Sequence, residues 1–283
     1  MELQQQIGIN FISLRTVKLQ LYSKDEAHLA NATAFFYRKN DKVYMITNWH
    51  NVTGLEPIIH TRKGATSPYE VRFKIPEKKP HTDPGLFNTV FSLKKMPLYK
   101  GEKPDWMIHP VFKDKVDVVA IDVSENSDDL QILCINDSEL DNDDREVVIS
   151  DDVYIVGYPF NRDTGKNLPI WKRGSIASEP QVDAEGLPMM YVDTASRPGM
   201  SGSPVFAKRI GIHAPPGEDV THPDTIIGEI RMFAGIYSGR LTENGEETMA
   251  QLGIVWKRAV IDEIIEGNLT DSIYYPGSSF PNQ

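Results

Sequence analysis

The sequence has almost no cysteine: Cys134 stands alone among 283 residues. A disulfide within the chain is therefore excluded, and stability must come from packing. Unpaired thiols are typical of a reducing compartment, so we expect a cytoplasmic protein. Cys134 lies in the apolar run 130–135, where a small buried side chain is a commoner explanation than a catalytic thiol.

Long hydrophobic runs and an excess of positive charge are also missing. No stretch approaches the roughly eighteen apolar residues that a membrane-spanning helix needs, and the first residues do not have the pattern of a signal peptide. The 30 basic residues are outnumbered by 40 acidic ones, which gives a formal charge of −10. We therefore expect neither a membrane nor a nucleic acid as partner.

What the sequence does contain is a series of short segments rich in β-branched and aromatic residues, separated by Gly, Pro, Asn and Asp. This pattern is typical of many antiparallel strands, so it predicts an all-β protein. A hydrophobic content of 40% is sufficient for one large domain or two small lobes. The strands are expected at 16–22, 33–37, 43–47, 69–75, 116–123, 153–156, 170–177, 189–194, 226–237 and 252–256.

A single helix is expected near the C-terminus. Val260, Ile261, Ile264 and Ile265 form an apolar stripe at helical spacing, and Gly267 stands where a C-cap is expected. The acidic segment 124–152 is the best candidate for a connection between two lobes, and an acidic run of this kind is usually a solvated surface. Segments 76–110 and 211–224 are expected to be long surface loops.

The strongest chemical signal is the run 197–206, RPGMSGSPVF, which sets the hydroxyl of Ser201 between glycines and ahead of an apolar strand. Glycines allow tight or positive-φ turns, which can expose the hydroxyl and direct the N–H groups of Gly199 and Ser201 toward one oxyanion. A glycine-rich turn without chemistry is the alternative. An α/β-hydrolase elbow is disfavoured, because it needs glycine two residues after the serine and Ser203 occupies that position.

A catalytic serine needs a base and an acidic partner for that base. His50 follows the strand expected at 43–47, where the chain enters a turn. Asp117 opens an almost wholly apolar segment, in which an ionised group needs compensation. Each residue alone is more often structural, but the order His, Asp, Ser is one that serine peptidases use.

These motifs resemble those of trypsin-like peptidases of the chymotrypsin superfamily, with the closest likeness to bacterial members and to high-temperature-requirement proteases. The histidine motif is 46–52, ITNWHNV; the aspartate motif is 116–121, VDVVAI; and the serine motif is 199–205, GMSGSPV. Segments 153–159, 174–178, 235–239 and 252–256 are similar to further strands of the family, so the resemblance extends from about residue 34 to 267.

The resemblance implies a single peptidase domain over residues 1–283. We expect two antiparallel six-stranded β-barrels, the first at about 8–125 and the second at about 153–256, joined by the acidic connection 124–152. A C-terminal helix is expected at about 257–267. The triad would lie between the barrels, with His50 and Asp117 from the first and Ser201 from the second.

The implied activity is serine endopeptidase cleavage of a protein or peptide substrate through an acyl-enzyme, with no cofactor. His50 would be the base, Asp117 its partner, Ser201 the nucleophile, and the Gly199 and Ser201 amides the oxyanion hole. The resemblance further implies that the substrate is bound by Ala195, Tyr237, Ser238, Gly239, Arg240 and Gly253.

Several points of this interpretation depart from the family pattern or stay open. Met200 replaces the aspartate of members that are activated by N-terminal cleavage, and Ala195 gives no acidic partner for a basic substrate side chain. His213 and His222 lie in one loop, but their spacing fits no strong metal motif, so we expect no metal.

A silent trypsin-like fold that binds proteins and an acyl-transfer enzyme are the rival interpretations. Self-association or a regulatory protein partner is also possible.

Overall fold

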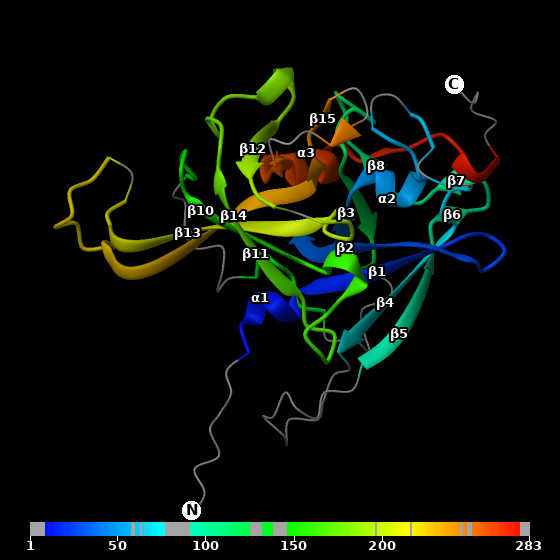
Figure 1. Cartoon of the computed structure of the whole chain (residues 1–283), viewed down its shortest axis with the longest axis horizontal. Helices are drawn as coiled ribbons and strands as arrows, with labels where there is room; N and C mark the ends of the chain where they lie inside the picture. The colour runs from blue at the N-terminus through cyan, green and yellow to red at the C-terminus, as the bar shows by residue number, and fades with distance from the viewer. Residues whose placement is uncertain are drawn as a thin grey trace, which may run out of the picture.

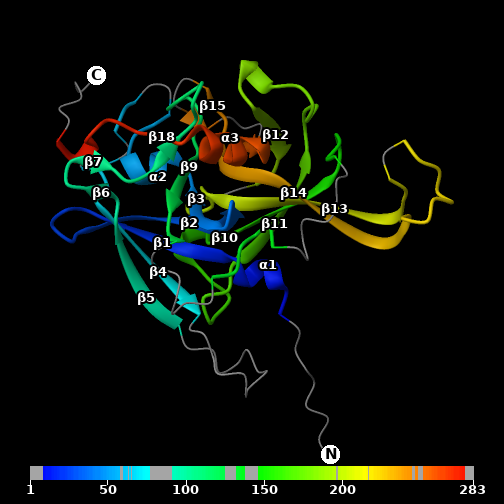
Figure 2. The same ribbon diagram turned by 180° about the vertical axis from the view of Figure 1, so that it is seen from behind.

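The computed structural model describes residues 9–57, 60–62, 64, 66–76, 91–124, 132–137, 146–195, 197–215, 217–243, 246–247 and 251–277. Within these ranges the chain is mostly β, as the sequence predicts. Two β lobes lie side by side, with the helix α3 (Ala259–Gly267) near the middle of the molecule, between them (Figures 1 and 2). Part of the acidic connection, at 125–131 and 138–145, falls outside the described residues.

The second lobe is a closed six-stranded barrel, in agreement with the prediction for this half of the chain. Its strand order is β10-β11-β12-β17-β14-β13, and all neighbours whose registers are given pair antiparallel. The strands are β10 (Asp152–Gly157), β11 (Ile170–Ile176), β12 (Met189–Asp193), β13 (Ser203–His213), β14 (Ile226–Arg240) and β17 (Leu252–Lys257).

The first lobe is an eight-stranded sheet in the order β18-β8-β9-β3-β2-β1-β4-β5, and the prediction of a closed six-stranded barrel here is wrong. Among the described residues the two end strands have one neighbour each, so hydrogen bonds do not close the sheet. The strands are β1 (Thr16–Tyr22), β2 (His28–Lys39), β3 (Lys42–Thr47), β4 (Glu70–Pro76), β5 (Phe91–Pro97), β8 (Met107–Ile108), β9 (Val119–Asp122) and β18 (Leu269–Thr270).

Two differences from the prediction enlarge the first sheet. Residues 91–108, expected as loop, contain strands β5 and β8 and the small hairpin of β6 (Tyr99–Lys100) and β7 (Lys103–Pro104). In addition, β18 comes from the chain beyond α3 and pairs with β8. A periodicity argument cannot find the two-residue strands β6, β7, β8 and β18, because two residues carry no detectable alternation. Strand β5 has seven residues and was missed within the segment expected as loop.

Apolar side chains fill each lobe and the region between the lobes. One buried cluster lies in the first sheet and another inside the barrel, while a third joins the two lobes through Phe35, Phe206 and Phe233. Phe233 contacts both other rings, at centroid distances of 5.6 and 5.5 Å. Side-chain packing therefore couples the lobes that contribute the two halves of the predicted triad.

Helix α3 buries the predicted stripe of Val260, Ile261, Ile264 and Ile265 against both lobes. The prediction of its C-cap was wrong by one residue, because Asn268 is the left-handed cap and Gly267 is the last helical residue. A side chain at Gly267 would approach Pro110 to within 2.6 Å, which gives a packing reason for this glycine.

The remaining elements are short, apart from one long arm. Beyond the barrel, β13 and β14 continue as a two-stranded arm that projects away from the body in both views (Figures 1 and 2). Within the described ranges the short elements include α1 (Phe11–Leu14), α2 (Trp49–Thr53), β15 (Thr242–Glu243), β16 (Glu246–Glu247) and the 3-10 turns Pro159–Asn161, Ala184–Gly186 and Tyr275–Gly277.

Candidate active site

The first-lobe half of the site is built around a short helix. Strand β3 ends at Thr47, and His50 lies on α2, which follows at once. The helix ends after one turn, because Gly54 takes the left-handed conformation at φ 73° and its N–H donates to the carbonyl of His50. The sequence indicated only a turn here, since five residues cannot produce a helical apolar stripe.

Asp117 lies just before β9 and holds His50 by two hydrogen bonds. The ring Nδ1 is 2.7 Å from Asp117 Oδ2, and the backbone N–H of His50 donates to Oδ1 at 2.9 Å. Asp117 is 1% exposed and His50 is 9% exposed. An ionised carboxylate can only accept hydrogen bonds, so Nδ1 carries the proton and Nε2 is left as the acceptor.

The backbone around Asp117 is fixed as well. The side-chain amide of Asn48 donates to the Asp117 carbonyl at 2.6 Å, which joins the entry to α2 to the entry to β9. Strands β3 and β9 pair directly, with Thr47 opposite Val119. The histidine and the aspartate are therefore brought together by the sheet register and then held by their own hydrogen bonds.

Ser201 lies in the turn that precedes β13 in the second lobe. Its carbonyl accepts from the Thr33 N–H at 2.9 Å, and the Asn51 amide donates to the same oxygen at 3.4 Å. Because Thr33 and Asn51 belong to the first lobe, the serine turn is attached to the lobe that carries His50. The predicted triad thus converges at the contact between the lobes.

Ser238, on β14, connects the two halves of the site. The Ser201 hydroxyl donates to the Ser238 carbonyl at 2.8 Å, and the Ser238 hydroxyl donates to Asp117 Oδ2. Among the described residues, no hydrogen bond joins Ser201 Oγ to the ring of His50. Ser238 was predicted only to bind substrate. Its contact with Asp117 could not be predicted from the sequence, because the two residues are 121 positions apart.

The two amides predicted for an oxyanion hole flank Met200. Gly199 has φ +93°, and a Cβ there would lie 2.5 Å from the carbonyl oxygen of Tyr158, so this position requires glycine. Among the described residues, the N–H groups of Gly199 and Ser201 have no acceptor, whereas those of Met200 and Gly202 donate to backbone carbonyls. Met200 is fully buried in the barrel core.

The residues predicted to bind substrate lie on three neighbouring segments. Ala195 follows β12 and is half-buried, while Gly239 and Arg240 pair with Ile254 and Gly253 of β17. The ring of Tyr237 covers Gly253, where an added Cβ would meet ring carbon Cε2 at 2.6 Å. Tyr237 is itself buried in the barrel core.

Cys134 and the loop histidines have no part in this site. Burial raises the pKa of the Cys134 thiol to about 12, so the group stays protonated near neutral pH. His213 Nε2 lies 3.2 Å from the Gly228 carbonyl, and His222 Nδ1 accepts from the Asp224 N–H.

In the part of the chain that the structure describes, no cluster of three His, Cys, Asp or Glu side chains could hold a metal ion. None of the described helices is long and apolar enough to cross a membrane.

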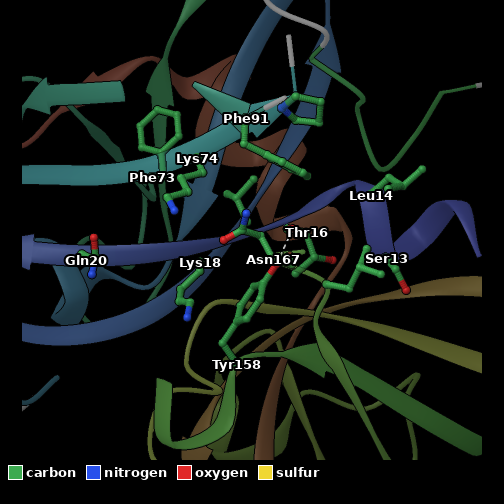
Figure 3. Close-up of a pocket in the computed structure, with 13 residues that line it drawn as sticks. Ser13, Leu14, Thr16, Lys18, Gln20, Phe73, Lys74, Phe91, Tyr158 and Asn167 are labelled. Carbon is green, nitrogen blue, oxygen red and sulfur yellow. Dashed lines mark hydrogen bonds between the residues drawn. The ribbon is translucent and has the colours of Figure 1, made fainter. Parts of the chain in front are cut away.

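A cavity of about 160 Å³ lies outside the predicted site, between α1, the first sheet and the loop after β10 (Figure 3). Tyr158 points into it and donates to the carbonyls of Thr16 and Asn167 at 2.9 and 2.7 Å. None of the three triad residues lines this cavity. This cavity is therefore separate from the predicted active site.

Residues 32–211 match the family model of the trypsin-like peptidase domain. This match covers more than half of the chain, and it includes His50, Asp117 and Ser201. A comparison with curated proteins gives no match.

Solved structures of the Rv3671c protease from M. tuberculosis are similar to the chain at low identity. The active form is 13% identical over 96% of this chain and 85% of the other, with a TM-score of 0.43. A serine-to-alanine mutant in the inactive form is 14% identical over 96% of this chain and 91% of the other, also with a TM-score of 0.43.

Proposed function

The chain belongs to the family of trypsin-like peptidase domains, and from that premise we propose that it is a serine endopeptidase whose triad is His50, Asp117 and Ser201. The observation that carries the proposal is the buried pair of His50 and Asp117, with Nδ1 at 2.7 Å from Oδ2, beside a serine on a glycine-rich turn. A buried carboxylate that orients an imidazole leaves Nε2 as a base.

The proposed reaction begins with a rotation of Ser201 about χ1, from the Ser238 carbonyl toward His50 Nε2. His50 then takes the hydroxyl proton as Oγ attacks the substrate carbonyl, and the charged imidazolium is stabilised by Asp117. The Gly199 and Ser201 amides donate to the oxyanion. His50 returns the proton to the leaving amine. Water then attacks the acyl carbonyl while His50 takes its proton, and His50 gives that proton to Ser201 Oγ as the carboxylic acid product leaves.

Substrate recognition is proposed to use the end of β14 that lies beside Ser201. Pairing of β14 with β13 ends at Tyr237, opposite Ser203, whereas pairing with β17 continues to Arg240. Ser238 and Gly239 therefore lie beyond the pairing with β13 and close to Ser201, where an extended peptide can add as a strand.

A small or apolar side chain is the proposed preference next to the cleaved bond. Ala195 supplies no charge, and the ring of Tyr237 occupies the space over Gly253 that a large side chain would need. Replacing Tyr237 with alanine should widen the preference toward larger side chains in a peptide library. An unchanged preference in a folded variant would contradict this assignment.

One observation favours a second candidate, a catalytically silent trypsin-like fold that binds proteins. The Ser201 hydroxyl donates to Ser238 O at 2.8 Å and makes no hydrogen bond to His50 among the described residues. In the silent fold this arrangement would be permanent, whereas in the peptidase it is one rotamer of a mobile hydroxyl.

A fluorophosphonate probe distinguishes the two candidates, because it reacts with a serine that a base has activated. The intact protein should acquire an adduct on Ser201, located by mass spectrometry, and Ser201→Ala and His50→Ala should abolish it. Ser203→Ala is the matched control, since Ser203 is a fully buried hydroxyl two residues away. Labelling without cleavage of any protein or peptide would indicate other acyl chemistry, and no labelling of the folded protein would support the silent fold.

A further inference from the structure

The chain beyond α3 returns to the first lobe and lies against β8, Trp106 and the helix α2 that carries His50. We call residues 269–275 the C-terminal strap. It pairs with β8, with Leu269 opposite Ile108, and the Asp271 N–H then donates to the Trp106 carbonyl at 3.2 Å. In both views this segment, coloured orange to red, passes beside α2 (Figures 1 and 2).

The centre of the strap is a buried carboxylate with three side-chain donors. Asp271 Oδ2 accepts from the indole nitrogens of Trp49 and Trp106 at 3.1 and 3.2 Å and from the Tyr275 hydroxyl at 2.8 Å. The Ser272 N–H donates to Oδ1 at 2.7 Å. All four donors are uncharged, and the triad does not use this carboxylate.

Aromatic packing encloses the carboxylate. Trp49 and Trp106 are almost completely buried, and Asp271 is 6% exposed. Tyr275 stacks on Trp106 and meets Trp49 edge to face, with centroid distances of 6.0 and 5.6 Å. A group fixed by hydrogen bonds within such packing has little freedom to move, because few alternative rotamers fit.

Trp49 connects the buried carboxylate of Asp271 to the helix that carries His50. It is the residue directly before His50 on α2, a helix of one turn whose N-cap Asn48 makes no side-chain capping hydrogen bond. So short a helix has little stability of its own. Asp117 holds the His50 side of α2, while Asp271 holds its Trp49 side through the indole.

From this geometry we propose that Asp271 is a positioning residue for His50, acting through Trp49. The inference rests on the proposed function, because it assigns His50 the role of base. The strap would make the geometry of the active site depend on a segment about 220 residues further along the chain than the histidine.

The test is Asp271→Ala, compared with Asp271→Asn, which keeps an oxygen acceptor for the indoles. We expect Asp271→Ala to lower the fluorophosphonate labelling rate and kcat for a peptide by about ten- to a hundredfold, with KM little changed, because displacement of a reacting group mainly affects the chemical step. Asp271→Asn should recover part of the rate. All measurements are made well below the unfolding temperature of each variant.

Asp262→Asn is the matched control from the same end of the chain. Asp262 lies on α3 and also binds the first lobe, with Lys39 Nζ at 2.6 Å and the Tyr37 hydroxyl at 3.2 Å, but it does not contact α2. Its loss should lower the unfolding temperature and leave kcat unchanged. Trp49→Phe removes one indole donor, and combined with Asp271→Ala it should slow the enzyme no further, since both act through one contact.

A spectroscopic readout separates this inference from the proposed function. In protein with isotope-labelled histidine, the His50 ring signals can be assigned by their loss in His50→Ala. They should shift or broaden in Asp271→Ala and remain in place in Asp262→Asn, even if no substrate is ever cleaved. Unchanged His50 signals and an unchanged labelling rate in Asp271→Ala would overturn the proposal. If that variant does not fold, Asp271→Asn and Trp49→Phe answer the same question.

Discussion

At the scale of single residues, the candidate site contains groups whose conformation is restricted by their neighbours. Asp117 accepts from the His50 backbone, the His50 ring and the Ser238 hydroxyl, so its carboxylate is fixed by three donors. Gly199 is restricted in a different way, by a positive φ and by the nearby Tyr158 carbonyl. Both restrictions pre-orient groups around the reacting bond, which is where an enzyme gains most from rigidity.

Gly199→Ala provides a residue-scale prediction. The added methyl group must displace the Tyr158 carbonyl, which lies 2.5 Å from the Cβ position, so the turn that carries the Gly199 amide has to move. We expect kcat to fall by about a hundredfold, the usual cost of losing one oxyanion donor.

The control for this change is Gly217→Ala, because Gly217 has a similar φ of +80° but no atom within 4 Å of its Cβ position. It imposes the same kind of backbone strain far from the serine turn. Steady-state kinetics with a peptide substrate should show a normal kcat for Gly217→Ala. Equal losses in the two variants would mean that general strain, and not the oxyanion amide, limits activity.

At the scale of elements, strands β13 and β14 have two parts with different environments. Near the barrel their side chains are buried, as Ile230 is at 4% exposed. In the projecting arm Ile212 and Ile227 face each other across the strands while 60% and 81% exposed. Isolated two-stranded ribbons are only marginally stable in water, so the arm adds little to the stability of the barrel.

Substitutions along this hairpin should therefore have unequal effects. Ile212→Thr and Ile227→Thr should each change the free energy of unfolding by less than about 0.5 kcal/mol, because exposed side chains lose little on replacement. Ile230→Thr buries a hydroxyl group in the core and should cost about 2 kcal/mol. Urea denaturation measures the free energy of unfolding of each of the three variants. A large loss from either arm variant would show that the arm is packed in solution.

At the scale of the whole molecule, the two lobes differ, because the second is a closed barrel and the sheet of the first is not closed by hydrogen bonds among the described residues. Every strand of the second lobe has two neighbours, whereas β5 at the end of the first sheet pairs only with β4 among the described residues. Side-chain packing of Phe35, Phe206 and Phe233 joins the lobes, and no disulfide does so, since Cys134 is a free thiol.

Hydrogen exchange should reflect this difference between the lobes. Amides of β13 that face β10 or β14 should exchange at least about tenfold more slowly than the paired amides of β5, because an end strand separates from its sheet at a lower free energy. Mass spectrometry of peptic fragments measures both regions in one experiment. Equal protection of the two strands would contradict this prediction.

The sequence by itself predicted a mostly β chain and the C-terminal helix, and the structure confirms both. It also singled out Ser201 by its glycine-rich turn, while the triad of His50, Asp117 and Ser201 stays a prediction. Those features depend on local patterns: alternation within a strand, a stripe on a helix, or glycines around a serine. Some strand bounds agree closely because turn residues mark them, as at 16–22, and at 170–176 against 170–177 predicted. Others differ, since β2 begins at 28 and not at 33, and β9 begins at 119 and not at 116.

Only the tertiary structure decided how these parts meet. The contact of Ser238 with Asp117, the ring of Tyr237 over Gly253, the open first sheet and the strap on Trp49 all join residues far apart in the chain. Such contacts depend on register and side-chain direction across the whole fold. No local pattern encodes them, because hydrophobic periodicity specifies which face of a strand is buried and not which residue covers it.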